Sequence, residues 1–189
     1  DVCSSDLATE KEIDKISDTE TSQGIIAVAC QKVTNIDYSL STVIVALDSI
    51  NDPGNLGTIL RTCDWFGVDG VLLGENCVEL FNPKVVRASM GSVFHLSIVA
   101  NVELEKELLM LREREFQIIS TSSHTKKSLF ELSIPRKSVI VFGNESQGIS
   151  PSLARISDVQ FSIPRFGKAE SLNVASACAS VLTVWKKKS

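Results

Sequence analysis

Short apolar runs alternate with amphipathic stretches from about residue 40 to the end of the chain, and this alternation restricts the fold more than any other feature. Thr42–Leu47 reads TVIVAL, a β-branched run typical of a strand covered on both faces. We predict strands at Thr42–Leu47, Val71–Leu73, Leu96–Val99, Gln117–Ser120, Val139–Phe142 and Val159–Ile163. We predict helices at Leu56–Phe66, Lys84–Val93, Val102–Glu115, Leu153–Ile156 and Leu172–Lys187. The sequence therefore predicts an α/β fold, a mostly parallel sheet with helices on both faces.

Length and composition exclude several classes of protein. The 189 residues, 43% hydrophobic and 22% charged, suit one globular domain with a fragment of another, and exclude collagen, coiled-coil and disordered chains. No apolar run reaches about 18 residues, so we expect no membrane span. An odd number of cysteines without a CxxC pair, beside only two histidines, predicts no metal site and a reduced, cytoplasmic protein. The cysteines are Cys3, Cys30, Cys63, Cys77 and Cys178.

The N-terminal region differs from the rest of the chain. Residues 1–7 (DVCSSDL) match the translation of a common sequencing-adapter end, and we expect them to be an assembly artefact. Residues 8–40 contain an acidic helix, an isolated strand predicted at Gly24–Cys30 and a polar stretch. We therefore expect residues 8–40 to be the remnant of a truncated N-terminal domain and its linker, followed by the main domain at 41–189.

Three polar, glycine-bearing segments follow predicted strands, where parallel sheets place their ligands. They are 51–57 (NDPGNLG), 143–148 (GNESQG) and 163–173 (IPRFGKAESLN). Helix capping explains much of each segment, through Asp52 or Asn55 in the first, Glu145 in the second and Ser171 or Asn173 in the third. Neither GxGxxG nor GxxxxGK[ST] occurs. His95 and His124 have no neighbouring nucleophile in the sequence, so we expect both to be structural or solvated.

Arg61 is harder to explain by structure alone. It is the only basic residue between Lys32 and Lys84, and it lies in an apolar helix close to that helix's N-terminal end. A guanidinium group there can hold a phosphate or a carboxylate through two hydrogen bonds. A structural and a functional role for this segment stay equally open on these residues alone.

Four segments in order resemble the signature motifs of one family. They read NDPGNLGTILRTCDWFGVDGVLL, NPKVVRASMGSVF, VIVFGNESQGIS and IPRFGKAESLNVASACASVL, within about residues 42–186. Together they resemble the SpoU (TrmH-type) RNA ribose methyltransferases of the SPOUT superfamily. Residues 17–31 also resemble the junction that follows a small substrate-binding domain in many rRNA-directed members.

The resemblance implies a fold, a cofactor and a reaction. It implies a deep C-terminal trefoil knot, S-adenosylmethionine bound in that knot, and methyl transfer to a ribose 2′-hydroxyl of RNA, with the site completed across a homodimer. By motif match the cofactor-binding residues are Thr121, Gly143, Ile163 and Leu172, and the catalytic residues are Arg61, Glu145, Ser171 and Asn173. Asn55 and Arg61 match substrate-binding positions.

The motifs leave three questions open. Arg165 and Lys168 add two charges where many relatives have smaller residues, so they either contact RNA phosphate or belong to an exposed loop. Large-subunit rRNA is favoured over tRNA as the substrate only by the junction at 17–31. The alternative from another class is a knotted RNA-binding or assembly factor without turnover, although a scaffold would not need the four catalytic residues together.

Overall fold

The structure is a computed structural model that describes residues 6–17, 19, 21–28, 30, 34–123, 125–133 and 135–188. The chain divides into two compact units, Asp1–Val33 and Thr34–Ser189. The first unit holds the helix α1 (Glu10–Ile16), none of whose residues is buried. The second holds every strand named below and the remaining helices.

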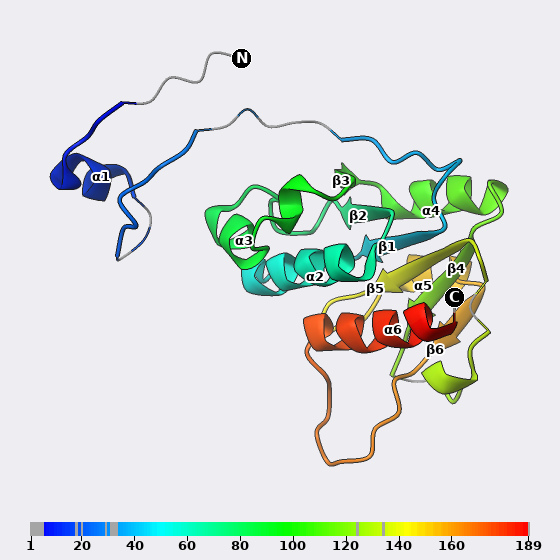
Figure 1. The fold of residues 1–189 in the computed structure, drawn as a ribbon. Coiled ribbons are helices and arrows are strands. Elements are labelled where there is room, and N and C mark those ends of the chain that lie inside the picture. Colours follow the sequence, from blue (N-terminus) through cyan, green and yellow to red (C-terminus); the bar gives the residue numbers. More distant parts are fainter. Residues whose placement is uncertain are drawn as a thin grey trace. The chain divides into compact units, whose positions relative to one another are not determined.

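A six-stranded sheet forms the centre of the second unit (Figure 1). Its order is β3-β2-β1-β5-β4-β6, and every neighbouring pair is parallel. The strands are β1 (Val43–Leu47), β2 (Gly70–Gly74), β3 (Ile98–Val102), β4 (Gln117–Thr121), β5 (Ser138–Phe142) and β6 (Val159–Phe161). The predicted parallel α/β architecture is confirmed.

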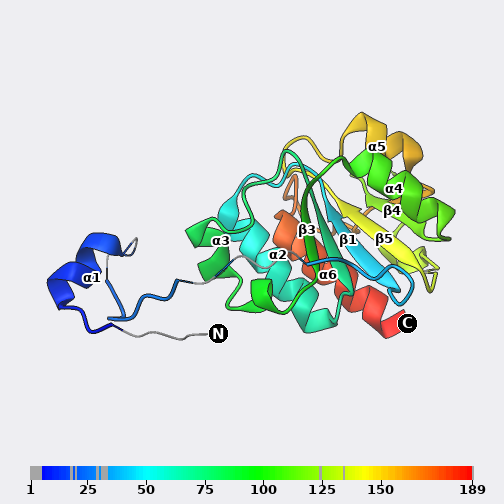
Figure 2. The same cartoon turned by 90° about the horizontal axis from the view of Figure 1, so that it is seen from above.

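Helices cover both faces of this sheet (Figure 2). The helices after α1 are α2 (Pro53–Phe66), α3 (Pro83–Ala88), α4 (Leu104–Glu113), α5 (Pro151–Ile156) and α6 (Val174–Lys188), with short 3-10 turns η1 (Ser92–Phe94) and η2 (Leu129–Glu131). One core lies between the sheet and α2, α3 and α6, and a second lies between the sheet and α4 and α5. Burial on both faces explains the continuous apolar sequence of the central strands.

Two predicted helices differ from the structure by three residues or more at one end. The helix predicted at Lys84–Val93 ends at Ala88, because Met90 and Gly91 adopt left-handed backbone angles (φ 52° and 92°) that a helix cannot continue through. The first helix of the sheet domain begins at Pro53, three residues before the predicted start, with Asp52 as its cap. Proline suits that position because its missing N–H has no partner there anyway.

Three predicted strands also need correction. The strand predicted at Leu96–Val99 runs from Ile98 to Val102, and the Thr34 hydroxyl fixes its start by bonding the N–H and the C=O of Ile98. β6 ends at Phe161, because the Ser162 N–H donates to the Lys127 carbonyl instead. The isolated strand predicted at Gly24–Cys30 is absent from the described residues 24–28 and 30. Among the helices of the described residues, none has the length and apolarity needed to span a membrane.

Candidate active site at the carboxyl edge of the sheet

The loops that follow β1 and β5 lie side by side, because these strands pair along their whole length and end together at Leu47 and Phe142. Three hydrogen bonds fasten the loops to each other. The Asp48 carboxylate accepts from the Ser150 N–H at 2.7 Å, the Asn144 side chain donates to the Ser49 carbonyl at 3.0 Å, and the Asp48 N–H donates to the Phe142 carbonyl at 2.9 Å. This edge of the sheet is therefore held in a defined conformation by its own polar groups.

Glu145 joins the three predicted segments. Its Oε1 accepts hydrogen bonds from the side-chain amides of Asn55 at 2.6 Å and Asn173 at 2.8 Å, and from the Val174 N–H at 3.3 Å. Asn173 also donates to the Asn55 side-chain oxygen at 2.9 Å. We call Asn55, Glu145 and Asn173 the Glu145 cluster. Residues 55, 145 and 173, distant in sequence, thus meet at one carboxylate oxygen.

The capping interpretations are partly correct. Asp52 caps α2, since its carboxylate accepts from the Asn55 N–H at 2.7 Å. Asn173 caps α6 by accepting from the N–H groups of Ala175 and Ser176, and it belongs to the Glu145 cluster as well. Glu145 does not cap the next helix, α5. It accepts from the Val174 N–H at the start of α6 instead, because the loop after β5 turns toward α6.

Arg61 lies on α2 with its side chain exposed. It has neither a hydrogen bond nor an ion pair to any residue that the structure describes, so the Glu145 cluster does not hold it. The first turn of its own helix contributes Asn55 to that cluster. A guanidinium group without a partner among the described residues therefore stands on the same helix that supplies one corner of the cluster.

The predicted cofactor-contacting residues come from the ends of three neighbouring strands, β5, β4 and β6, and from the start of α6. Thr121 closes β4 and donates to the Val141 carbonyl at 3.3 Å. Ile163 is partly buried against the core, and Leu172 is 50% exposed. Two apolar side chains of the segment 163–173 thus have surface available to a ligand.

Gly143 is required by the loop itself. A Cβ at this position would lie 2.2 Å from the Gly148 carbonyl group and 2.3 Å from the Ile149 nitrogen, a separation that no side chain permits. The loop 143–149 therefore closes tightly on its own backbone. Contact between Gly143 and a cofactor stays a prediction.

The remaining predicted residues are exposed. Ser171 is exposed at the end of the segment 163–173, two residues before Asn173. Arg165 donates to the Ala169 carbonyl at 3.2 Å, and Lys168 is exposed in the same loop. His95 is also exposed and its Nδ1 lies 3.2 Å from Asp64, which fits the expected structural or solvated histidine, whereas His124 lies outside the described residues.

Sequence reasoning missed Asp48 and Asn144. Asn144 Oδ1 accepts from the N–H of Ser146 at 2.9 Å and of Gln147 at 3.3 Å, which folds the loop locally. Its place in GNESQG was the available signal, because asparagine beside glycine favours such turns. Asp48 gave no comparable signal, since its partner Ser150 lies 102 positions away in the sequence.

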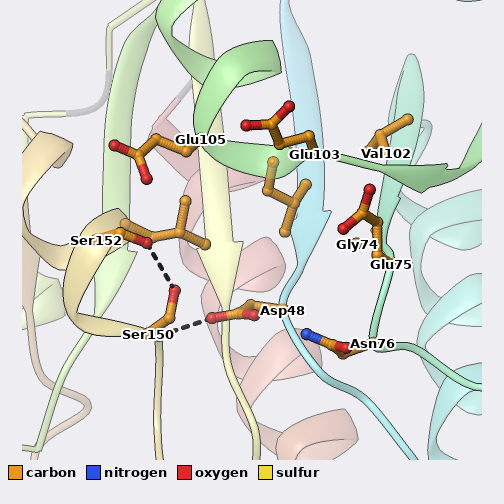
Figure 3. A pocket seen from close by; sticks show the side chains of 11 residues that line it. Asp48, Gly74, Glu75, Asn76, Val102, Glu103, Glu105, Ser150 and Ser152 are labelled. Carbon is orange, nitrogen blue, oxygen red and sulfur yellow. Dashed lines mark hydrogen bonds between the residues drawn. The ribbon is translucent and has the colours of Figure 1, made fainter.

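A cavity of about 180 Å³ opens on the other side of the sheet edge, between α4 and α5 (Figure 3). Carboxylates dominate its polar lining, from Asp48, Glu75, Glu103 and Glu105, so it does not suit a phosphate group. Asp48 is already paired with Ser150, and within the described ranges of the chain no cluster of His, Cys, Asp or Glu could hold a metal ion. None of the predicted site residues lines this cavity.

Comparisons with known proteins identify the family of this chain. Residues 42–183 match the model of the SpoU rRNA Methylase family. The chain is 31% identical over 173 residues to the 23S rRNA (guanosine(2553)-2′-O)-methyltransferase RlmP of Bacillus subtilis, covering 92% of this chain and 68% of that protein. It is 37% identical over 138 residues to an uncharacterized tRNA/rRNA methyltransferase of Synechocystis, covering 73% of this chain and 50% of that one. The chain thus spans between half and about two thirds of these relatives.

Solved methyltransferase structures are also similar to this chain. An AdoMet-bound rRNA methyltransferase from Sinorhizobium meliloti superposes with a TM-score of 0.84 at 30% identity, over 95% of this chain and 70% of that one. The SpoU methyltransferase AviRb from Streptomyces viridochromogenes, in complex with AdoMet, gives 0.73 at 27% identity, over 78% and 61%.

Proposed function

This chain belongs to the SpoU rRNA methylase family, and from that premise we propose that it is an S-adenosylmethionine-dependent methyltransferase acting on a ribose 2′-hydroxyl of RNA. The observation that carries the proposal is the Glu145 cluster. One carboxylate oxygen ties together residues of three family motifs, and Arg61, which has no partner in the described part of the chain, stands on a helix that bonds to this cluster through Asn55. A side chain free to bind an anion beside a rigid polar framework is what positioning of a nucleotide requires.

We propose that Thr121, Gly143, Ile163 and Leu172 hold the cofactor. The fit rests on chemistry that this structure displays, namely the partly buried Ile163 and half-exposed Leu172, which offer apolar surface to an adenine ring. When bound, S-adenosylmethionine supplies a methyl group already activated for transfer by its sulfonium.

Arg61 is the residue that acts on the substrate in this proposal. Its guanidinium group binds the phosphate next to the target ribose through two hydrogen bonds and so orients the 2′-hydroxyl. It also stabilises the negative charge that develops on the hydroxyl oxygen as that oxygen takes the methyl group and its proton passes to solvent water. A guanidinium group is protonated at physiological pH, so orientation and charge stabilisation are its main contributions. Ser171 and the Glu145 cluster place the ribose, and Arg165 and Lys168 contact RNA phosphate.

The proposed substrate is large-subunit rRNA. RlmP, similar over 92% of this chain, is named for methylation of 23S rRNA, and the junction at 17–31 also resembles rRNA-directed members. We further propose that residues 8–40 are the remnant of a truncated N-terminal RNA-substrate-binding domain and its linker, which the same resemblance at 17–31 supports. Sequencing of the source locus tests this and the proposed adapter origin of residues 1–7; a native start codon directly before Asp1 would contradict both.

We also propose a C-terminal trefoil knot, a homodimer and a cytoplasmic location. The bond between Glu145 and Asn173 supports the knot, because it places the start of α6 against the loop after β5. An experimental density map traces the knot directly. For the dimer, sedimentation of the purified chain should give about twice 20.6 kDa. The apolar residues of α6 already pack within this chain, so pairing would use its exposed face around Ser176 and Thr183.

Transfer of labelled methyl from S-adenosylmethionine to unmodified rRNA and tRNA pools tests the function. We expect label in rRNA as 2′-O-methylribose, lost in Arg61→Ala and retained in Arg155→Ala, which removes an exposed arginine from α5 on the opposite face of the sheet. Label confined to tRNA would show that the substrate is tRNA and not large-subunit rRNA. Cofactor binding without label in either pool, even with an upstream domain restored, would favour a non-catalytic RNA-binding factor.

A further inference from the structure

The segment before η2 and the loop after β6 run next to each other. The Ser162 N–H donates to the Lys127 carbonyl at 2.8 Å, and the Leu129 N–H donates to the Ser162 carbonyl at 2.9 Å. The loop 162–173 then extends away from the sheet before it returns to α6 (Figure 1). Two segments about 35 residues apart in sequence are therefore held side by side at Ser162.

These two segments combine cations with an unusually exposed aromatic ring. Phe166 is 91% exposed, which is a costly position for a phenyl group in water. Arg165 and Lys168 are exposed cations beside it in the sequence. Two more, Lys126 and Lys127, are exposed on the segment that pairs with the start of its loop at Ser162. We call these residues the basic–aromatic patch: Lys126, Lys127, Arg165, Phe166 and Lys168.

The charge of the patch is not neutralised locally. The lysines of the patch have no ion pair within the part of the chain that the structure describes, and Arg165 bonds only a backbone carbonyl. Two acids lie in the same segments: Glu131 is bonded to the Ser128 N–H, and Glu170 is exposed. Four positive charges against two negative ones leave the surface net positive, which favours a polyanion over a protein partner of mixed charge.

We propose that Phe166 stacks on an unpaired base of the RNA substrate while the cations of the patch bind the phosphates of the same strand. This inference rests on the proposed function and specifies that the loop binds an unpaired base and its neighbouring phosphates. An aromatic face binds any base, and neighbouring cations follow the backbone, so the combination suits single-stranded rather than duplex RNA. The loop that carries Phe166 also carries Asn173 of the Glu145 cluster, so the patch and the cluster are joined by one segment of chain.

The test distinguishes contacts to the RNA bases from contacts to the phosphate backbone of the RNA. The probes are a labelled 12-nucleotide oligoadenylate and an abasic oligomer of the same length, bound to the full chain at several salt concentrations. The variants are Phe166→Ala, Phe166→Trp and Arg165→Ala. The matched controls are Phe94→Ala, an exposed phenylalanine in η1, and Lys106→Ala, an exposed lysine on α4.

We expect Phe166→Ala to weaken binding of the oligoadenylate roughly tenfold and to leave the abasic oligomer unchanged, with Phe166→Trp restoring affinity. Arg165→Ala should weaken both probes and lower the salt slope by about 0.7. Both controls should bind as the unchanged protein does. Equal loss for both probes in Phe166→Ala, or no loss for either, would overturn the stacking role.

Two parallel measurements keep this inference distinct from the proposed function. Calorimetry with S-adenosylmethionine shows whether Phe166→Ala weakens cofactor binding without affecting RNA, which would place Phe166 in the cofactor pocket and overturn the inference. Methyl transfer by the unchanged chain is measured separately. Base-dependent binding through Phe166 without any methyl transfer would remove the proposed activity and leave the stacking role standing.

Discussion

The Glu145 cluster and the basic–aromatic patch share the loop between β6 and α6, but they are built in opposite ways. The side chains of the cluster bond one another, with one carboxylate oxygen accepting from Asn55, Asn173 and Val174. The patch leaves four cations and a 91% exposed phenyl ring facing water. Hydrogen bonds among the side chains of the cluster indicate a framework that holds the loops in place. Exposed cations beside an exposed apolar ring indicate a surface that binds a ligand.

Gly143→Ala should have the largest effect, because it destabilises the loop 143–149 that carries Glu145. A methyl group would overlap backbone atoms of Gly148 and Ile149, and these cannot move aside as the end of a flexible side chain can. We expect a loss of about 3 kcal/mol in the free energy of unfolding, at the upper end of the range for overpacking. Urea denaturation measures this loss.

Gly167→Ala is the matched control on the patch side. Nothing lies within 4 Å of a Cβ placed there, so stability should change by less than about 0.5 kcal/mol. Equal losses for the two glycine variants would contradict the proposed difference between the two regions.

Glu145→Ala should cost about 1–2 kcal/mol, because three donors lose their common acceptor at a surface where water replaces part of it. Glu145→Gln keeps an oxygen acceptor and should recover most of that stability in the same urea experiment. If Glu145→Ala unfolds at the same urea concentration as the unchanged protein, the cluster does not hold the site together.

The double variant Arg165→Ala, Lys168→Ala should leave stability unchanged and weaken RNA binding. The expected loss in the logarithmic salt slope is about 1.4 for a single strand, since each phosphate contact contributes about 0.7. Filter binding across a salt series measures it. An unchanged affinity and slope would make this part of the patch an ordinary exposed loop.

Cysteine reactivity gives the smallest effect. The pKa of the Cys63 thiol is raised well above its usual range by its contact with the Cys178 thiol and by burial, which disfavours the reactive thiolate. Exposed Cys30 should react at once with an aromatic disulfide reagent, and Cys63 and Cys178 only as the protein unfolds. Rapid labelling of Cys63 in the folded protein, mapped by mass spectrometry, would show that the packing between α2 and α6 opens.

The sequence predicts the sheet well and the site in part. The strand Thr42–Leu47 could be predicted because burial on both faces demands a continuous apolar run. The strand at Ile98 was displaced because the Thr34 hydroxyl sets its start, a contact across 64 positions that no local pattern encodes. The apolar segment at Gly24–Cys30 carried a strand-like composition, but no strand partner joins residues 24–28 in the structure.

The site shows the same division. Asn55, Glu145 and Asn173 were found as separate polar positions in three segments, and the fold shows that they meet at one oxygen. Phe166 drew no functional prediction, because an exposed phenylalanine cannot be told from a core phenylalanine without the structure. Charge next to it, at Arg165 and Lys168, was the only signal that the sequence offered.

The central claim is that the framework holds the site and Arg61 acts in it. Initial methylation rate and urea stability, measured on the same preparations of the unchanged chain and of Arg61→Ala, test this directly. We predict a rate reduced by a factor of about 10²–10³, typical of losing one group that stabilises developing charge, with stability changed by less than about 0.5 kcal/mol. A rate that stays within twofold, or falls only together with stability, would contradict the claim.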